Sequence, residues 1–263
     1  MGILPHVPKF GSSVVLIIGG TSGVGLAAAM KFAAAGVRKV VIVGRNIERG
    51  EAARSKVAEV YPETDVRFIA GDANRATDAL RICEETIAAF KSVDILLNST
   101  VGSAPPALLK NIPIEELESI LVEQAIGPIL MCRAVIPYMV AAQGGVILNI
   151  SSDAAKLATP GETVIGGAMA AIVMFSRALA MEAKRDGIRV NALTPSVIEG
   201  TLTNELMQQN PFAAKLFDKA GKMASLGVAV ADDLADLAVF LASPAAKKIT
   251  GQAISVNGGI SAA

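Results

Sequence analysis

The 263-residue chain is poor in the side chains that most often mark catalysis or metal binding. It contains one histidine, two cysteines and two tyrosines, and it has no tryptophan. Its 24 basic residues balance 24 acidic ones, so the formal net charge is zero. A neutral chain has no basic field that would attract nucleic acid or anionic lipid. We therefore expect neither nucleic acid nor a membrane as a partner, and we expect no metal site.

The two cysteines, Cys83 and Cys132, lie far apart, each within an apolar helical pattern. This placement indicates small buried hydrophobes in a reducing compartment. Residues 1–11 lack the charged and apolar regions of a signal peptide. The apolar stretches are interrupted before the ~18 residues that a membrane helix needs. We expect a soluble cytoplasmic protein, with His6 in a disordered start and without a catalytic role.

Short β-branched runs alternate with longer amphipathic runs along the whole chain. The expected strands are 14–18, 40–43, 66–69, 95–98, 146–150, 189–193 and 253–256. The expected helices are 24–35, 47–60, 77–90, 115–142 and 164–185. This alternation predicts an α/β fold, a doubly wound, Rossmann-like parallel sheet of about seven strands with helices on both faces. No linker or shift in composition interrupts it, so we expect one domain over residues 1–263.

One polar segment departs from the alternation, from about Glu199 to Gly227. Long excursions in compact domains are commonly lids or binding loops. We predict a short helical lid over a substrate cleft at 199–227.

A glycine-rich run follows the first expected strand and opens the first expected helix. Glycines at this junction let the backbone turn sharply and approach a pyrophosphate, and the helix N-terminus supplies free N–H donors. The sequence therefore predicts a dinucleotide-binding loop, made by Gly19, Thr21, Ser22, Gly23, Val24 and Gly25.

Gly44 and Arg45 directly follow the second expected strand, and neither position holds a carboxylate. A carboxylate there would bind the ribose hydroxyls of NAD(H), whereas an arginine accommodates a 2′-phosphate. We therefore favour NADP(H) over NAD(H); the alternative is a solvent-facing arginine. Asp72, beside Ala73 after the third strand, is placed to accept a hydrogen bond from the adenine amine.

These features and several further motifs resemble the short-chain dehydrogenase/reductase family from about Ser13 to Gly259. The similar segments are Ile18–Gly25, Asp94–Asn98, Gly145–Ser152, Gly187–Ala192 and Thr250–Gln252. The resemblance implies a nicotinamide cofactor, with Asn98 near it and Ser152 as the catalytic serine. Residues 194–201 resemble the family's Pro-Gly-x-x-x-Thr segment, with Ser196 in place of the glycine. By that match the Ile198 backbone and the Thr201 hydroxyl would hold the carboxamide, and Pro195 would also contact the cofactor.

The family's usual active site combines a tyrosine acid/base, a lysine four residues later, a serine and an asparagine. Counting thirteen residues from Ser152 places Ile165 at the tyrosine position and Met169 at the lysine position. Gln124 replaces the asparagine. Neither Ile165 nor Met169 can exchange a proton with a carbonyl oxygen. The resemblance therefore implies an atypical member in which only Ser152 of the four is retained.

If a proton is still transferred, a group near Ser152 must supply it. Glu162, one turn before Ile165, is our first choice; Glu123, Asp153 and Lys156 are the others, and for each a solvated charge is the competing interpretation. Ile165 and Met169 would line an apolar substrate pocket. The small residues 166–171 imply close helix packing between copies, hence a homodimer or homotetramer.

Three functions remain open. The first is an NADP(H)-dependent oxidoreductase that acts on a small apolar substrate without the tyrosine–lysine pair, for which an iminium or an activated alkene would suit. The second is a non-redox enzyme such as an isomerase, dehydratase or lyase. The third is a catalytically silent cofactor-binding protein.

Overall fold

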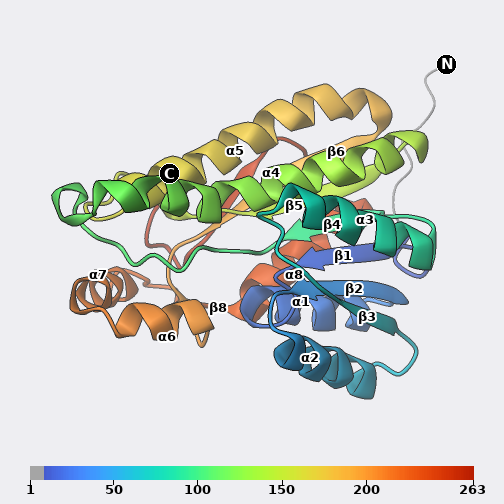
Figure 1. Ribbon diagram of the computed structural model, residues 1–263, viewed down its shortest axis with the longest axis horizontal. Helices are drawn as coiled ribbons and strands as arrows, with labels where there is room; N and C mark the ends of the chain where they lie inside the picture. The colour runs from blue at the N-terminus through green and yellow to red at the C-terminus, as the bar shows by residue number, and fades with distance from the viewer. Residues whose placement is uncertain (1–8) are drawn as a thin grey trace.

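The computed structural model describes residues 9–263, and His6 lies outside them. Its centre is a parallel sheet of seven strands in the order β3-β2-β1-β4-β5-β6-β9 (Figure 1). The strands are β1 (Val14–Ile18), β2 (Lys39–Gly44), β3 (Asp65–Ala70), β4 (Ile95–Asn98), β5 (Gly145–Ile150), β6 (Ile188–Pro195) and β9 (Ala253–Val256). This sheet confirms the predicted fold class, and the predicted strands agree within two residues at each end.

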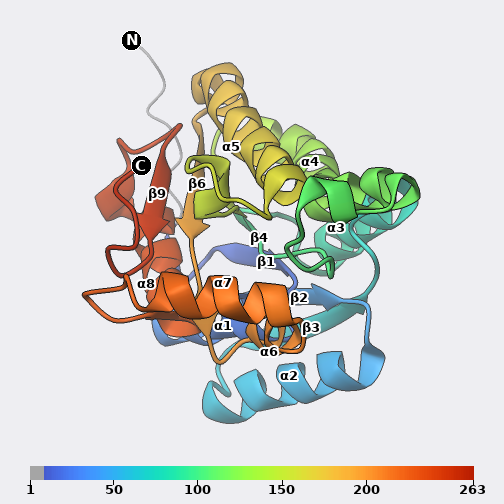
Figure 2. The same cartoon turned by 90° about the vertical axis from the view of Figure 1, so that its left-hand side faces the viewer.

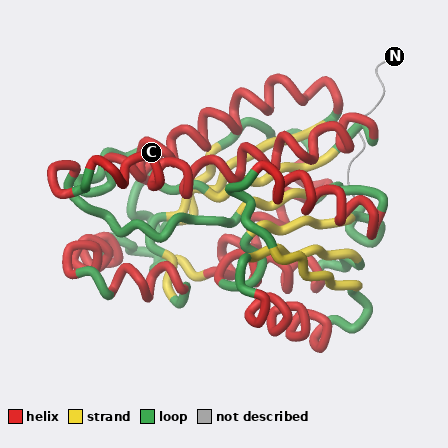
Figure 3. Tube along the Cα trace, viewed as in Figure 1, coloured by secondary structure: helices red, strands yellow, loops and turns green. Residues whose placement is uncertain are grey.

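Helices cover both faces of the sheet (Figures 2 and 3). One layer contains α1 (Gly23–Ala34), α2 (Ile47–Val60) and α8 (Ala231–Ala242); the other contains α3 (Ala76–Phe90), α4 (Leu117–Ala141) and α5 (Thr163–Ala183). Alternate residues of β1 serve the two cores, because Val15 and Ile17 pack toward α1 and α8 while Leu16 packs toward α3 and α4. Every residue of β1 is therefore buried, as a doubly covered sheet requires.

The strand order reverses beside β1, which pairs with β2 on one side and β4 on the other. Ligands of open α/β sheets bind outside the carboxyl ends of the strands at such a switch point. The fold thus places the loops after β1 and β4 around one crevice.

The excursion after β6 contains two helices, α6 (Leu202–Gln208) and α7 (Pro211–Gly221), which lie beyond the carboxyl ends of the strands (Figure 1). The two ends of this excursion pair as a second, two-stranded sheet, which we did not predict from the sequence. Its strands are β7 (Ile198–Glu199) and β8 (Ala229–Val230). The two ends of the excursion are therefore tied together by backbone pairing.

Charged residues interrupt the apolar stretches of α4 and α5, but the length and mean hydropathy of these helices are those of possible membrane spans. Two helices, Ile114–Ala141 and Thr163–Asp186, are long and apolar enough to cross a membrane. Core helices of soluble proteins pass the same test, and here α4 and α5 pack on each other and on the sheet core. The apolar character of these helices thus has a packing explanation.

Both cysteines are buried and free, as predicted. Burial raises the pKa of the Cys83 thiol to about 11 and that of Cys132 to about 12. Both thiols behave as small core hydrophobes.

Candidate functional site

A cavity of about 670 Å³ opens at the carboxyl ends of β1, β2, β4, β5 and β6. Its lining includes Arg45 and Asp72, which follow β2 and β3, and Met223 and Ile260 from the last part of the chain. The lining includes predicted cofactor and substrate residues, namely Gly19, Thr21, Ser22, Gly23, Val24, Arg45, Asp72, Ala73, Gln124, Ser152, Glu162, Ile165, Met169, Pro195, Ile198 and Thr201. The fold therefore gathers most of the predicted site into one cleft.

The glycine-rich loop is shaped by close backbone approach. Gly19 and Gly23 have φ angles of +78° and +48°, which L side chains rarely adopt. A Cβ on Gly25 would overlap the Gly19 carbonyl group. Ser22, the N-cap of α1, makes no side-chain capping bond, so the first N–H groups of α1 are open to a ligand. The loop thus fits a pyrophosphate held by backbone donors.

The carboxyl end of β2 packs against the glycine-rich loop (residues 19–25, called the phosphate loop below). A Cβ on Gly44 would lie 2.7 Å from Cγ2 of Thr21, so this glycine permits the close packing of β2 on the loop. Arg45 is exposed at the rim, and Arg49 donates from Nε to Thr21 Oγ1 at 3.4 Å. Sequence reasoning missed Arg49; its signal is its place in the first turn of α2, four residues after Arg45. Two guanidinium groups, those of Arg45 and Arg49, therefore line the cleft beside the end of β2.

Asn98 is placed differently from the other predicted cofactor residues. Its side chain is 1% exposed and donates from Nδ2 to Asn149 Oδ1 at 2.8 Å, and Asn149 in turn donates to Ser176 Oγ. Its own Oδ1 has no hydrogen-bond partner among residues 9–263. Asn98 thus ties β4 to β5 and α5 beneath the cleft.

The loop after β4 is held by α4. Gln124 is 2% exposed and accepts a hydrogen bond from the Gly102 N–H at 3.1 Å. Glu123 accepts from Ser103 Oγ at 3.3 Å. These two neighbours therefore fix the cleft wall formed by residues 99–104.

The predicted substrate residues lie on the loop after β5 and at the start of α5. Ser152 Oγ accepts from the Ala154 N–H at 3.1 Å, and Ser151 Oγ donates to the Met169 carbonyl oxygen at 2.9 Å. Glu162 is the N-cap residue of α5 and is half-buried in the cleft wall. Burial raises the pKa of the Glu162 carboxyl above its usual range, which favours the protonated form. Ser152, Glu162, Ile165 and Met169 thus share one wall.

Thr201 links the cleft to the excursion. Its Oγ1 donates to the Ile198 carbonyl at 3.1 Å and accepts from the Asn204 N–H at 3.2 Å, which caps α6. Its methyl group lies 3.5 Å from the position of a Cβ on Gly23. The excursion therefore starts in contact with the phosphate loop.

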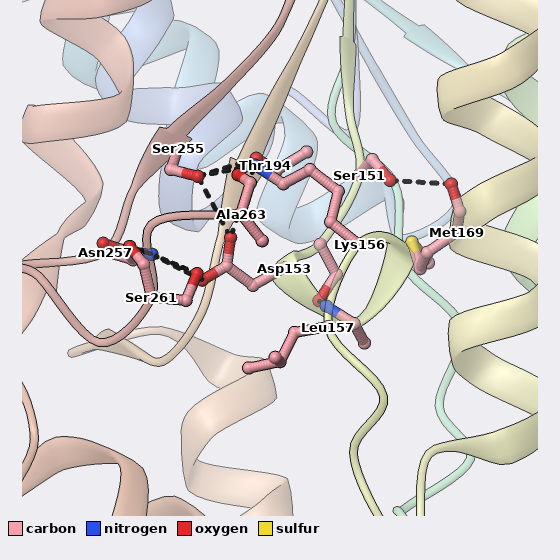
Figure 4. A network of polar contacts seen from close by, with 12 residues as sticks. Ser151, Asp153, Lys156, Leu157, Met169, Thr194, Ser255, Asn257, Ser261 and Ala263 are labelled. Atoms are coloured by element: carbon pink, nitrogen blue, oxygen red, sulfur yellow. Dashed lines mark hydrogen bonds and ion pairs between the residues drawn. The ribbon is translucent and has the colours of Figure 1, made fainter.

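Asp153 and Lys156 are not solvated charges, which corrects the competing interpretation for both. Asp153 is 5% exposed and accepts hydrogen bonds from Ser255, Asn257 and Ser261 (Figure 4). Lys156 donates to Ser255 Oγ and to the Ala263 carbonyl oxygen, each at 2.6 Å. Both side chains bind the end of the chain, and Lys156 does not line the cleft. Neither tyrosine of the chain, Tyr61 or Tyr138, lines the cleft.

Comparison with known proteins agrees with this site. Residues 19–261 match the family model described as enoyl-(acyl carrier protein) reductase. The 3-oxoacyl-[acyl-carrier-protein] reductase of Chlamydia trachomatis serovar D is 33% identical over 251 residues, which cover 95% of this chain and 97% of the relative. The chain belongs to the short-chain dehydrogenase/reductase family.

Two solved structures are similar over nearly their whole length. YwfH, an NADPH-dependent reductase of bacilysin biosynthesis, superposes with a TM-score of 0.87 at 26% identity and covers 96% of this chain and 99% of its own. A 7α-hydroxysteroid dehydrogenase complexed with NADH and 7-oxo glycochenodeoxycholic acid gives a TM-score of 0.86 at 25% identity, with 95% of each chain covered. The family assignment makes this chain an oxidoreductase with a nicotinamide dinucleotide cofactor and a small-molecule substrate.

Proposed function

We propose that the protein is an NADP(H)-dependent oxidoreductase that acts on a small apolar substrate without the tyrosine–lysine pair of its family. The observation that carries this proposal is the composition of the cleft wall on α5. Ile165 and Met169, one helical turn apart, line the cleft where the family pattern places the tyrosine and the lysine. Neither Tyr61 nor Tyr138 lines the cleft, which supports an active site without a tyrosine of this chain.

The choice of NADP(H) rests on the adenosine end. The end of β2 has Gly44 and no carboxylate that could bind ribose hydroxyls. Arg45 and Arg49 line the cleft beside it. A guanidinium recognises a phosphate through a planar fork of donors. Asp72 and Ala73 would flank the adenine, and the loop from Gly19 to Gly25 would hold the pyrophosphate. When bound, the cofactor supplies or accepts a hydride at its nicotinamide ring.

The nicotinamide end would be held by the segment after β6. Pro195, Ile198 and Thr201 line the cleft beside the phosphate loop. The Ile198 backbone and the Thr201 hydroxyl are suited to a carboxamide, which both donates and accepts hydrogen bonds. Gln124 would support this region indirectly, because it fixes the opposite wall at Gly102.

The substrate end is mostly apolar. Its walls include Leu157, Ile165, Leu206, Met207, Leu216, Phe217 and Met223. Met169 offers no ammonium group, so an oxyanion that forms from a ketone would lack a cationic neighbour on α5. Hydride transfer to an iminium or to an activated alkene needs less help from an acid. We therefore propose one of these as the reacting group.

Two side chains of this wall can still serve chemistry. Ser152 can orient a polar substrate atom, because its hydroxyl hydrogen is not committed by the bond it accepts from Ala154. Glu162 can hold a proton, because burial raises its carboxyl pKa. We assign Ser152 to orientation and Glu162 to proton transfer.

The excursion supplies the outer wall. The cleft wall that faces α5 is lined by Leu202, Leu206, Met207 and residues of α7 (Figure 1). We propose that α6 and α7 act as a lid within a single domain, closing over the bound substrate. We also propose a homodimer or homotetramer, which the exposed Met174 and Met181 on α5 support and which light scattering would measure directly.

The decisive experiment titrates NADPH and NADH by fluorescence and then follows the absorbance of bound NADPH with ketones, cyclic imines and enones. We expect tighter binding of NADPH than of NADH, and oxidation by an imine or an enone but not by simple ketones. Turnover without change in nicotinamide absorbance would indicate a non-redox enzyme instead. Tight binding with no turnover on any class would indicate a silent cofactor-binding protein.

A further inference from the structure

The buried carboxylate of Asp153, directly after Ser152, accepts hydrogen bonds from three side chains in residues 255–261. Asp153 Oδ2 accepts from Ser261 Oγ at 2.8 Å and from Asn257 Nδ2, and Oδ1 accepts from Ser255 Oγ at 3.3 Å (Figure 4). Lys156 Nζ lies 3.8 Å from Asp153 Oδ1. These groups satisfy a charge that is 5% exposed, and such a charge is costly to bury without partners.

The segment held by Asp153 forms part of the cleft wall. Ile260 is 9% exposed and lines the cleft between the two residues, Asn257 and Ser261, that donate to Asp153. Asn257 Oδ1 accepts from the Gly259 N–H at 3.0 Å, so its amide group makes hydrogen bonds on both sides. The position of Ile260 therefore depends on the carboxylate that follows Ser152.

The same segment also contacts the end of the excursion. The Gly258 carbonyl oxygen accepts from the Leu226 N–H at 3.0 Å. A Cβ on Gly258 would overlap the Gly227 carbonyl oxygen, so the two backbones lie in direct contact. A continuous path thus runs from Asp153 through Asn257 and Gly258 to the segment that follows α7.

We infer that Asp153 is a positioning residue for the substrate end of the cleft. Through Asn257 and Ser261 it sets Ile260, and through Gly258 it anchors the end of the excursion against the loop that carries Ser152. The three hydrogen bonds that Asp153 accepts come from Ser255, Asn257 and Ser261, and none comes from the phosphate loop or from the proposed adenosine end. Its loss should disturb substrate binding more than cofactor binding.

The first test does not depend on the proposed function. Hydrogen–deuterium exchange is compared for the full-length protein and for Asp153→Asn. We expect faster exchange in residues 257–263 and 224–227 together, with no change in residues 19–25. A change confined to 151–157 would overturn the inference. Asp65→Asn is the matched control, because it makes the same change in a carboxylate whose ion pair with Arg67 is exposed.

The second test restores the pair with its polarity reversed. The double variant combines Asp153→Asn with Asn257→Asp. An amide and a carboxylate still face each other, but the amide at position 153 now donates to the carboxylate at position 257. We expect this double variant to regain at least half of the lost exchange protection. If it exchanges as fast as Asp153→Asn alone, the contact is not what positions the segment. Should Asp153→Asn fail to fold, Ser261→Ala removes one donor, leaves the carboxylate with Asn257, and should raise exchange in both segments.

The third test rests on the proposed oxidoreductase function. With the imine or enone that the wild type turns over, Asp153→Asn should raise KM at least fivefold while the NADPH Kd stays within twofold. The reversed pair should bring KM back within about threefold of the wild type. Equal losses in KM, kcat and NADPH affinity would overturn the inference. If no substrate is found, the oxidoreductase proposal fails and the exchange tests alone decide the role of Asp153.

Discussion

Gly25, in the first turn of α1, packs directly on the backbone of Gly19 at the end of β1, with no room for a methyl group between them. Gly25→Ala should therefore displace the phosphate loop. Overpacking of this kind costs about 1–3 kcal/mol, and a displaced loop aims its N–H donors wrongly. We expect at least a tenfold loss of NADPH affinity in a fluorescence titration, together with a lower thermal midpoint.

Gly11→Ala is the control for that change, because no atom of residues 9–263 lies within 4 Å of a Cβ there. It should leave the NADPH affinity unchanged. Unaltered binding in Gly25→Ala would mean that the loop tolerates the methyl group by moving elsewhere, and the assignment of the pyrophosphate to this loop would be wrong.

Arg45 is the simplest test of cofactor choice. Arg45→Ala removes a guanidinium from the adenosine end, and hydrogen bonds to charged groups are worth roughly 1.5–3 kcal/mol, or about 10- to 100-fold in affinity. The NADPH Kd should rise by that factor while the NADH Kd changes less than threefold. Arg49→Ala should act in the same direction. Arg54→Ala, in an exposed ion pair with Glu51, should change neither constant. An equal effect of Arg45→Ala on both cofactors would contradict a 2′-phosphate contact.

The parts of the molecule that could be predicted from sequence are those whose physics is local. The strand β1 shows five consecutive apolar residues because both its faces are covered, and the glycine-rich loop is recognisable because its glycines lie close together along the chain. The helix α4 was also predicted, although Pro128 and Pro137 lie inside it. Local pattern therefore predicted the sheet, the helical layers and the sharp turn of the glycine-rich loop.

The parts that could not be predicted depend on contacts between distant segments. Asp153 finds its donor on Asn257, 104 residues later, so its sequence neighbours suggest only a surface charge. The strands β7 and β8 have two residues each, too few to show a period, and form only because the excursion brings them together. Arg49 is an exposed residue of α2, and its place in the cleft follows from the packing of that helix.

The raised pKa of Glu162 has a consequence for stability. Because burial favours the neutral carboxyl, the folded protein keeps a proton that the unfolded chain releases. Stability should therefore fall as the pH rises through the window between the ordinary value near 4.5 and the raised value, and stay lower above it. Glu162→Gln cannot ionise and escapes this loss.

Thermal midpoints at pH 4 and pH 8 check this expectation. The midpoint of Glu162→Gln relative to wild type should increase from pH 4 to pH 8, whereas Glu63→Gln, an exposed glutamate before β3, should follow the wild type at both values. Parallel profiles for wild type and Glu162→Gln would mean that Glu162 is hydrated in solution. With a substrate in hand, Glu162→Gln should also remove the pH dependence of kcat if this carboxyl transfers the proton.

The α5 wall permits a gain-of-function test of the whole proposal. Ile165→Tyr with Met169→Lys places a phenol and an ammonium one helical turn apart, beside Ser152 and within the cleft. General acid catalysis is typically worth about 10²- to 10⁴-fold, so ketone reduction with NADPH should rise by at least about 100-fold over the unmodified protein. Each single substitution should give much less, because a lysine lowers the pKa of a neighbouring phenol only when both are present. Tyr138→Phe, on the α4 surface away from the cleft, should leave all rates unchanged. If the double variant folds and binds NADPH but reduces no ketone, the cofactor is not held in a productive position, and the oxidoreductase proposal loses its geometric basis.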